Sequence, residues 1–185
     1  RTKSRGLGDV YKRQFVNGRT SFFHNSISGY HAAKPKRMQD IYDFYLLKNN
    51  LRVLDMLNVK YIIDLNESGN IELKINEDVM GSAWFVDEVQ KVTDSNQELL
   101  GLSSIDYKKT CLSTNLNNKT YPDSSENYIE IVDKRANQIT YKVSSNDTGF
   151  VVFSEAFYKN GWVAKINGEI TDHYKVNYLL RGLEV

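Results

Sequence analysis

Several residue types and patterns that mark specialised proteins are scarce or absent in this sequence of 185 residues. Cysteine occurs once, as Cys111, which excludes an internal disulfide and an all-cysteine metal site. Proline occurs twice, too rarely for a low-complexity chain, and no apolar run approaches the roughly 20 residues of a membrane-spanning helix. The formal net charge is +1, so no global field gathers nucleic acid, and we expect no nucleic-acid partner. What is present, 41% hydrophobic and 25% charged residues, is the composition of an ordinary globular protein.

Candidate catalytic residues are equally scarce. As a nucleophile, Cys111 would need a nearby histidine, and all three histidines are far from it in sequence, so we expect a buried apolar residue. The acidic pairs Asp40/Asp43 and Asp87/Glu88 fit solvated charge on a helix and on opposite faces of a strand. No Ser-His-Asp order, glycine-rich phosphate loop or metal-spaced histidine pair can be singled out. We therefore assign no catalytic, cofactor-binding or metal-binding residue, and no cofactor.

One segment, residues 64–75, has the order of oxygen-bearing side chains found in a calcium loop. Its sequence is DLNESGNIELKI, but Ile75 stands at the twelfth position, which needs a bidentate carboxylate. The flanking residues have the composition of strands rather than of the two helices of an EF-hand. We predict a hairpin with a Gly-Asn turn, and a calcium site is the alternative.

The first fourteen residues, RTKSRGLGDVYKRQ, are basic and lack the periodic apolar residues of the sequence that follows. They resemble a translated sequencing-adapter tail, so residues 1–14 are excluded from the fold prediction. The alternative is a native basic arm.

Helical periodicity dominates the first half of the chain. Residues 35–50 form an amphipathic helical pattern with Pro35 suited to the first turn, and its apolar face comprises Met38, Ile41, Tyr42, Tyr45 and Leu46. A short helix over 51–58 follows, then strands over 59–64, 71–75 and 83–92. Residues 94–104 are typical of a short capped helix or a loop. Together these elements predict a helix-plus-strand α/β subdomain over residues 15–105.

After a turn-rich stretch at 121–127, the apolar period changes to two. Residues 128–135, 137–145 and 149–157 predict three successive strands whose buried face comprises Ile129, Ile131, Ile139, Tyr141, Val143, Val151 and Phe153. Residues 162–168 and 174–185 add two or three more strands. Short strands without intervening helices predict an antiparallel, jelly-roll-like β-sandwich over 122–185, with 106–121 as a connecting segment. The expected fold class is therefore α+β.

Aromatic residues make up 12% of the chain, which allows a carbohydrate-binding role. Exposed rings stack on sugars, so Trp162, Tyr158 and Trp84 are candidate sugar contacts. Large rings also fill sandwich cores, and core packing is the interpretation that we favour. If Trp162 is core, Trp162→Ala should cost about 3–5 kcal/mol.

Two stretches near the end, SEAFYKNGWVAKINGE and HYKVNYLLRGLEV, resemble the last extracytoplasmic segment of YfhO-type bacterial membrane proteins. The upstream stretches SFFHNSISGYHAAKPKRMQDIYDF, VLDMLNVKYII and GSAWFVDEV resemble the same family in the same order, so the resemblance covers residues 15–185. The family pattern falls on Ser154, Glu155, Tyr158, Gly161, Trp162, Asn167, Gly168, Asn177, Tyr178 and Arg181. We expect these residues to be structural, with Gly161 and Asn167-Gly168 forming turns and Trp162 anchoring the next strand.

The resemblance implies that the chain is a non-catalytic, extracytoplasmic domain of a multi-pass membrane protein. Its parent would be similar to the GT-C class of glycosyltransferases, which act on cell-envelope polymers with lipid-linked sugar donors. The implied partners are the transmembrane region of the same polypeptide and a lipid-linked sugar or glycan. In the family a further strand follows the position of Val185, so the resemblance also implies a sandwich truncated at its C-terminus. The alternative is a free-standing carbohydrate-binding or adhesion module.

Overall fold

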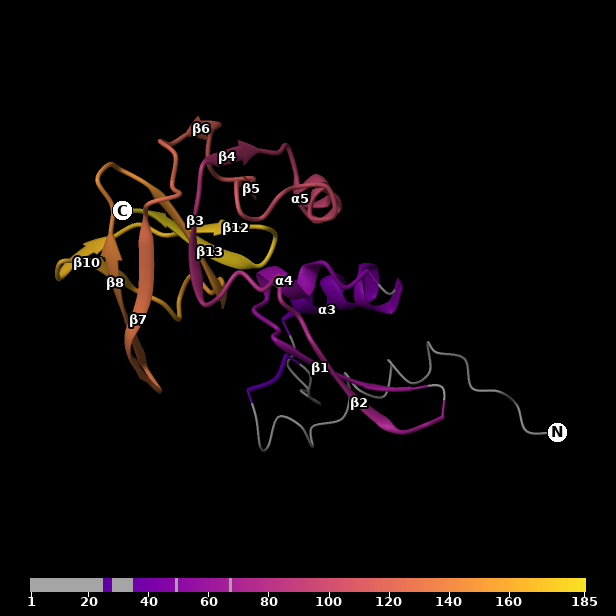
Figure 1. Cartoon of the computed structure of the whole chain (residues 1–185). Helices are drawn as coiled ribbons and strands as arrows, with labels where there is room; N and C mark the ends of the chain where they lie inside the picture. Colours follow the sequence, from indigo (N-terminus) through magenta and orange to yellow (C-terminus); the bar gives the residue numbers. More distant parts are fainter. Residues whose placement is uncertain (1–24, 28–34, 49, 67) are drawn as a thin grey trace. The chain divides into compact units, whose positions relative to one another are not determined.

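The structure, a computed structural model, describes residues 25–27, 35–48, 50–66 and 68–185 (Figure 1). The chain divides into two compact units, Arg1–Val79 and Met80–Val185, called here the first and second unit. Helices and mostly antiparallel strands together confirm the α+β class. The tail expected at residues 1–14 lies outside the described residues.

The first unit contains the predicted helices. Helix α3 (Lys36–Phe44) follows Pro35, is continued by the 3₁₀ turn η1 (Leu46–Lys48), and is succeeded by the short α4 (Val53–Met56). Of the predicted apolar face, Ile41, Tyr42, Tyr45 and Leu46 are buried. From α4 and its end, Val53, Leu54, Met56 and Leu57 are buried. The three- and four-residue spacing therefore identified the inward face correctly.

The hairpin predicted over residues 64–75 is confirmed. Strand β1 (Tyr61–Leu65) pairs antiparallel with β2 (Ile71–Ile75). The turn is closed by the Asn66 side chain, whose Oδ1 accepts from the backbone N–H groups of Ser68 and Asn70 at 3.1 and 2.9 Å. Gly69 supplies the positive φ of 79° that the turn requires. The Asn66 side chain of this segment thus has a turn-forming role.

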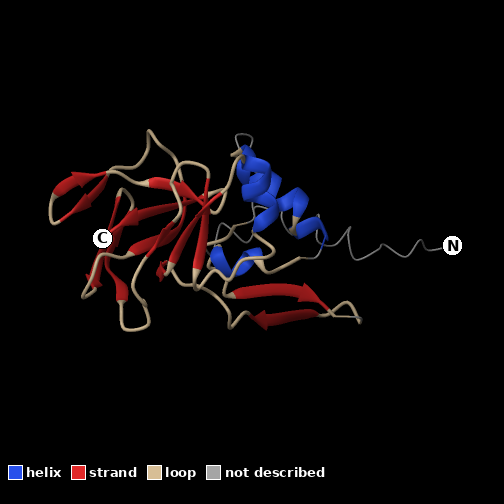
Figure 2. Ribbon diagram, turned by 90° about the horizontal axis from the view of Figure 1, so that it is seen from above, coloured by secondary structure: helices blue, strands red, loops and turns tan. Residues whose placement is uncertain are grey.

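The second unit is built on a four-stranded antiparallel sheet with the order β12-β13-β9-β3. Its strands are β3 (Ala83–Val86), β9 (Phe150–Ala156), β12 (Tyr174–Val176) and β13 (Leu180–Glu184). The regular structure of this unit consists of strands and one helix, α5 (Figure 2). The central strand β9 buries residues on both of its faces, Phe150, Val151, Val152 and Phe153.

One face of this sheet carries an apolar cluster. Phe85, Val151, Phe153 and Leu183 pack there with Ala164 of β10 (Ala164–Ile166), which pairs with β11 (Glu169–Thr171). The long hairpin of β7 (Tyr128–Arg135) and β8 (Gln138–Ser144) adds Ile129 and Tyr141 to the cluster. The predicted buried face is right for Val151 and Phe153, which are buried. It is wrong for Val143, which is 39% exposed.

A second, three-stranded sheet has the order β5-β4-β6. It comprises β4 (Glu88–Lys91), β5 (Thr110–Ser113) and β6 (Lys119–Thr120), and β4 and β5 are parallel. Helix α5 (Ser95–Gly101) connects these two strands, capped by Asp94, whose carboxylate accepts from the N–H groups of Asn96 and Gln97. The single strand expected over 83–92 is two strands separated at Asp87.

The boundary between the units differs from the expected one. Residues 15–105, 106–121 and 122–185 were expected as subdomain, connecting segment and sandwich, whereas the break lies between Val79 and Met80. The reason is long-range strand pairing: Trp84 of β3 lies opposite Val152 of β9. The expected connecting segment also contains β5 and β6. Periodicity identifies strands but not their partners, so β3 was assigned to the wrong part of the chain.

Candidate functional site

The turn between β9 and β10 contains Tyr158, Gly161 and Trp162. A Cβ atom added to Gly161 would lie 2.3 Å from a ring carbon of Tyr158, so a larger residue there would require the Tyr158 ring to move. The Tyr158 side chain is 64% exposed. Further on, Asn167 and Gly168 have φ values of 52° and 91° and form the two-residue turn of the β10–β11 hairpin. Two positive φ angles are the signature of a type I′ turn, which confirms the hairpin predicted there.

Three family-pattern residues, Glu155, Trp162 and Arg181, form a contiguous group that we call the motif cluster. Arg181 on β13 is 7% exposed, and its guanidinium makes an ion pair with the Glu155 carboxylate on the neighbouring strand β9. The same guanidinium lies 4.0 Å from the centre of the Trp162 ring, within the range of a cation–π contact. The Trp162 ring therefore covers a buried charge rather than filling the apolar core.

Tyr141 of β8 completes the motif cluster. Its hydroxyl donates to Glu155 Oε1 at 2.8 Å. Burial, and then the charge and hydrogen bond of Glu155, raise the pKa of Tyr141 above its ordinary value. Glu155 thus accepts from Tyr141 and pairs with Arg181, which leaves it engaged in holding β8, β9 and β13 together.

Ser154 and Trp84 also make internal contacts. The Ser154 hydroxyl donates to the carbonyl of Gly81, fixing the segment that leads into β3. The Trp84 indole N–H donates to the carbonyl of Tyr107 at 2.8 Å, and the side chain is only 7% exposed. A ring buried to this extent presents no face to a sugar, so the structure gives Trp84 a core position.

Asn177 and Tyr178 form a buried turn between β12 and β13 with φ values of 49° and 68°. Positive φ is tolerated by asparagine and unusual for an aromatic residue. Asn177 accepts from the Leu112 N–H through its Oδ1 at 2.9 Å and donates its own N–H to the Leu112 carbonyl at 2.8 Å. The turn is therefore fixed to β5 by a reciprocal pair of hydrogen bonds, and sequence reasoning did not identify Leu112 as the partner.

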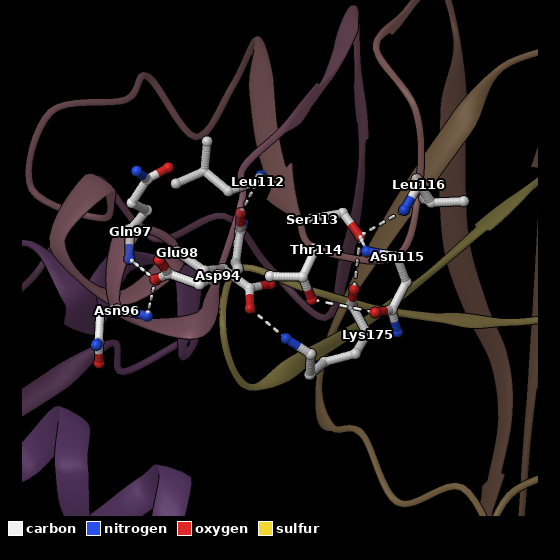
Figure 3. Close-up of polar contacts among 11 residues, drawn as sticks. Asp94, Asn96, Gln97, Glu98, Leu112, Ser113, Thr114, Asn115, Leu116 and Lys175 are labelled. Atoms are coloured by element: carbon white, nitrogen blue, oxygen red, sulfur yellow. Dashed lines mark hydrogen bonds and ion pairs between the residues drawn. The ribbon is translucent and has the colours of Figure 1, made fainter.

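A buried ion pair that the sequence analysis missed connects α5 with β12. Glu98 of α5 and Lys175 of β12 form it, with side chains 0% and 9% exposed (Figure 3). Nearby, the Ser113 hydroxyl donates to the Lys175 carbonyl at 3.1 Å and accepts from the Asn115 N–H at 3.1 Å (Figure 3). The available signal was a lysine within the mostly apolar pattern YKVNYLL, because a charge in a buried strand requires a partner.

An open groove of about 580 Å³ lies elsewhere on the second unit, lined among others by Lys119, Tyr121, Phe150, Tyr174 and Glu184. Lys119 and Tyr121 both donate to the Glu184 carboxylate, the tyrosine at 2.9 Å. The Lys119 hydrogen bond, above all, lowers the pKa of Glu184. Burial, and then Glu184, raise the pKa of Tyr121 above its ordinary value. The motif cluster does not line this groove.

Cys111, the candidate nucleophile considered from the sequence, belongs to β5 of the second unit. Cys111 is fully buried, and burial raises the pKa of its thiol well above the ordinary value, so it is not a thiolate. Among the described residues, no three histidine, cysteine, aspartate or glutamate side chains are grouped so as to hold a metal ion. Nor does any described helix have the length and apolar character needed to cross a membrane.

Comparison of the chain with protein-family models, with curated proteins and with solved structures found no match.

Proposed function

We propose that this chain is a non-catalytic extracytoplasmic domain of a multi-pass membrane protein of the YfhO type. Its parent would be a GT-C-like glycosyltransferase that modifies cell-envelope polymers with lipid-linked sugar donors. The observation that carries the proposal is that the family-pattern residues are used in contacts within the second unit. Residues that are engaged in internal contacts stabilise the domain, so the catalytic residues of the parent would lie outside this chain.

The contacts of the pattern residues support this division. Ser154 holds the approach to β3, and Asn177 holds β5. Glu155, Trp162 and Arg181 neutralise and cover one another. A catalytic carboxylate needs access to substrate and a pKa matched to its task, whereas Glu155 already has an ion-pair partner and a hydrogen-bond donor. The partner of the domain would be the transmembrane region of the same polypeptide.

The test is the topology of the parent protein. The gene extended upstream in frame should encode several hydrophobic helices. Alkaline phosphatase fused after Val185 in that longer protein should be active, and green fluorescent protein fused at the same position should be dark, because the first matures only outside the cytoplasm and the second only inside. A fluorescent, phosphatase-inactive fusion would contradict the proposal. A control fusion within a cytoplasmic loop should give the opposite pair of signals.

A free-standing carbohydrate-binding or adhesion module is the second candidate, and one observation favours it. The Tyr158 ring is 64% exposed and lies over Gly161, next to the partly buried Trp162. An exposed ring on a turn is a suitable platform for a sugar. A secretion signal directly upstream of residue 15, together with glycan binding that Tyr158→Ala abolishes without a change in melting temperature, would favour this candidate over the first.

A further inference from the structure

The hairpin of the first unit presents an apolar face to solvent. All five residues of β2 are exposed, including Ile71, Leu73 and Ile75 at 78%, 59% and 60%. Opposite Ile75 and Leu73 on β1 are Tyr61 and Ile63, which are 56% and 46% exposed. Directly opposed residues share one face of an antiparallel pair, so these side chains form a continuous apolar surface. Exposed surfaces of this kind mark interaction sites.

The outer edge of β2 also carries backbone groups suited to pairing. Among the described strands β2 pairs with β1 alone. Asn76 donates its N–H to the Lys60 carbonyl, and the Asn70 carbonyl accepts from the Asn66 N–H, so the even-numbered residues face β1. Backbone groups alternate between the two edges of a strand, so the N–H and C=O groups of Ile71, Leu73 and Ile75 face outward. Such an edge is a template for another strand.

The sequence of β2, IELKI, is complementary to itself in one antiparallel register. With Leu73 opposite Leu73 of a second copy, Ile71 lies opposite Ile75, and Glu72 lies opposite Lys74. The pairing then has apolar contacts on one face of the sheet and, in total, two opposite-charge pairs on the other face. Shifting the register by two residues would place Glu72 opposite Glu72 or Lys74 opposite Lys74, and a parallel arrangement would do both. The charges therefore select one register.

We propose that two copies of this chain associate through β2, with the two edges pairing antiparallel about Leu73 to form a four-stranded sheet. The occupant of the edge is a second copy because IELKI complements itself in charge. The contact is isologous and closes as a dimer. This inference concerns the first unit and is independent of the function proposed above.

The dimer is expected to be weak. An edge-to-edge contact of five residues buries less than the roughly 1,200 Å² of a standard interface, so monomer and dimer should coexist at about 10 µM to 1 mM. In one copy Glu72 and Lys74 already lie 3.8 Å apart, with side chains about half exposed. Both are therefore accessible, and changing either one leaves the pairing of β1 with β2 in place.

The experiment is sedimentation velocity of the full chain over that concentration range with charge-reversal variants. Lys74→Glu and Glu72→Lys should each weaken association by at least about tenfold, because like charges then oppose each other across the seam. An equimolar mixture of the two variants should associate as the unmodified chain does, since an acidic β2 then faces a basic one. The double variant Glu72→Lys/Lys74→Glu should likewise recover. Glu77→Lys, which lies outside the strand and changes the net charge by the same amount as Glu72→Lys, is the matched control for that variant and should have no effect.

Amide exchange gives a second readout. The N–H groups of Ile71, Leu73 and Ile75 should exchange more slowly as the concentration rises, and those of the Lys74→Glu variant should not. A chain that stays monomeric at 1 mM would overturn the proposal. So would association that is indifferent to the charge variants, or open-ended growth beyond the dimer, because either would indicate non-specific contact between apolar faces.

Discussion

Both units contain strands with apolar residues at every second position, but these residues are buried in the second unit and exposed in the first. In the second unit Val151 and Phe153 of β9 are 0% and 8% exposed beneath the β7–β8 hairpin and β10. In the first unit Ile71 and Leu73 of β2 are 78% and 59% exposed. The alternation identifies which face of a strand is apolar. Whether that face becomes core depends on a second layer, which in the second unit comes from strands distant in sequence.

The largest expected effect separates the two units by truncating one aromatic side chain in each. Phe150→Ala should lower the free energy of unfolding of the second unit by about 3–5 kcal/mol, because the ring is 1% exposed and fills the space above Gly182. Tyr61→Ala in β1 should cost less than about 1 kcal/mol, because that ring is 56% exposed. Urea unfolding followed by circular dichroism measures both. Equal losses would contradict the division into covered and uncovered strands.

A similar effect is expected from the buried ion pair. Lys175→Met leaves the Glu98 carboxylate buried without its cation, which should cost about 3–5 kcal/mol of unfolding free energy. Replacing both residues, as Glu98→Leu/Lys175→Met, should recover most of the loss. Lys74→Met removes a cation of the first unit that is about half exposed and should change stability by less than about 0.5 kcal/mol. A double variant no more stable than Lys175→Met alone would show that the loss arises elsewhere.

The parts of the fold that sequence could predict are those set by local physics. The apolar face of α3, the Asp94 cap of α5 and the two-residue turn at Asn167-Gly168 depend on residues within one or two turns of chain. The helix face and the turn were predicted, and residues 94–104 were assigned as a short capped helix or a loop, because spacing, a capping side chain and a positive φ act over that short range.

The parts that could not be predicted depend on partners distant in sequence. β3 belongs to the four-stranded sheet, where Trp84 lies opposite Val152, and the parallel pairing of β4 with β5 depends on α5. Glu98 and Lys175 meet across 77 positions, and neither residue alone indicates the other. For the candidate site, the sequence supplied the members of the motif cluster but not their arrangement. It therefore placed Trp162 in the core rather than over Arg181.

An intermediate effect is expected at Trp162, where the side chain is only partly buried. Trp162→Ala should cost about 1–2 kcal/mol by uncovering the Arg181 guanidinium, less than the loss expected for a core ring. Trp162→Phe keeps an aromatic face over the cation, so its loss of stability should be about half of the loss caused by Trp162→Ala. Thermal unfolding measures both variants. A loss above about 3 kcal/mol would restore Trp162 to the core. An unchanged melting temperature with loss of glycan binding would instead favour the carbohydrate-binding candidate.

The smallest expected effect compares two half-exposed ion pairs, one in each unit. Lys119–Glu184 in the second unit joins residues 65 positions apart and has side chains 51% and 45% exposed, whereas Glu72–Lys74 in the first joins near neighbours. Because the pKa of Glu184 is lowered in the folded state, its contribution to stability is present above its unfolded value of 4.5 and is lost as pH falls through the lower folded value. Solvent screening limits this contribution to less than about 1 kcal/mol. Lys119→Met should therefore reduce the stability of the second unit at pH 7 by that amount. It should also make the fall in stability below pH 4.5 less steep. Glu72→Gln is the control for removing one exposed charge. Urea midpoints measured from pH 7 to pH 3 give the comparison, and an acid decline as steep in Lys119→Met as in the unmodified chain would show that this ion pair does not link stability to pH.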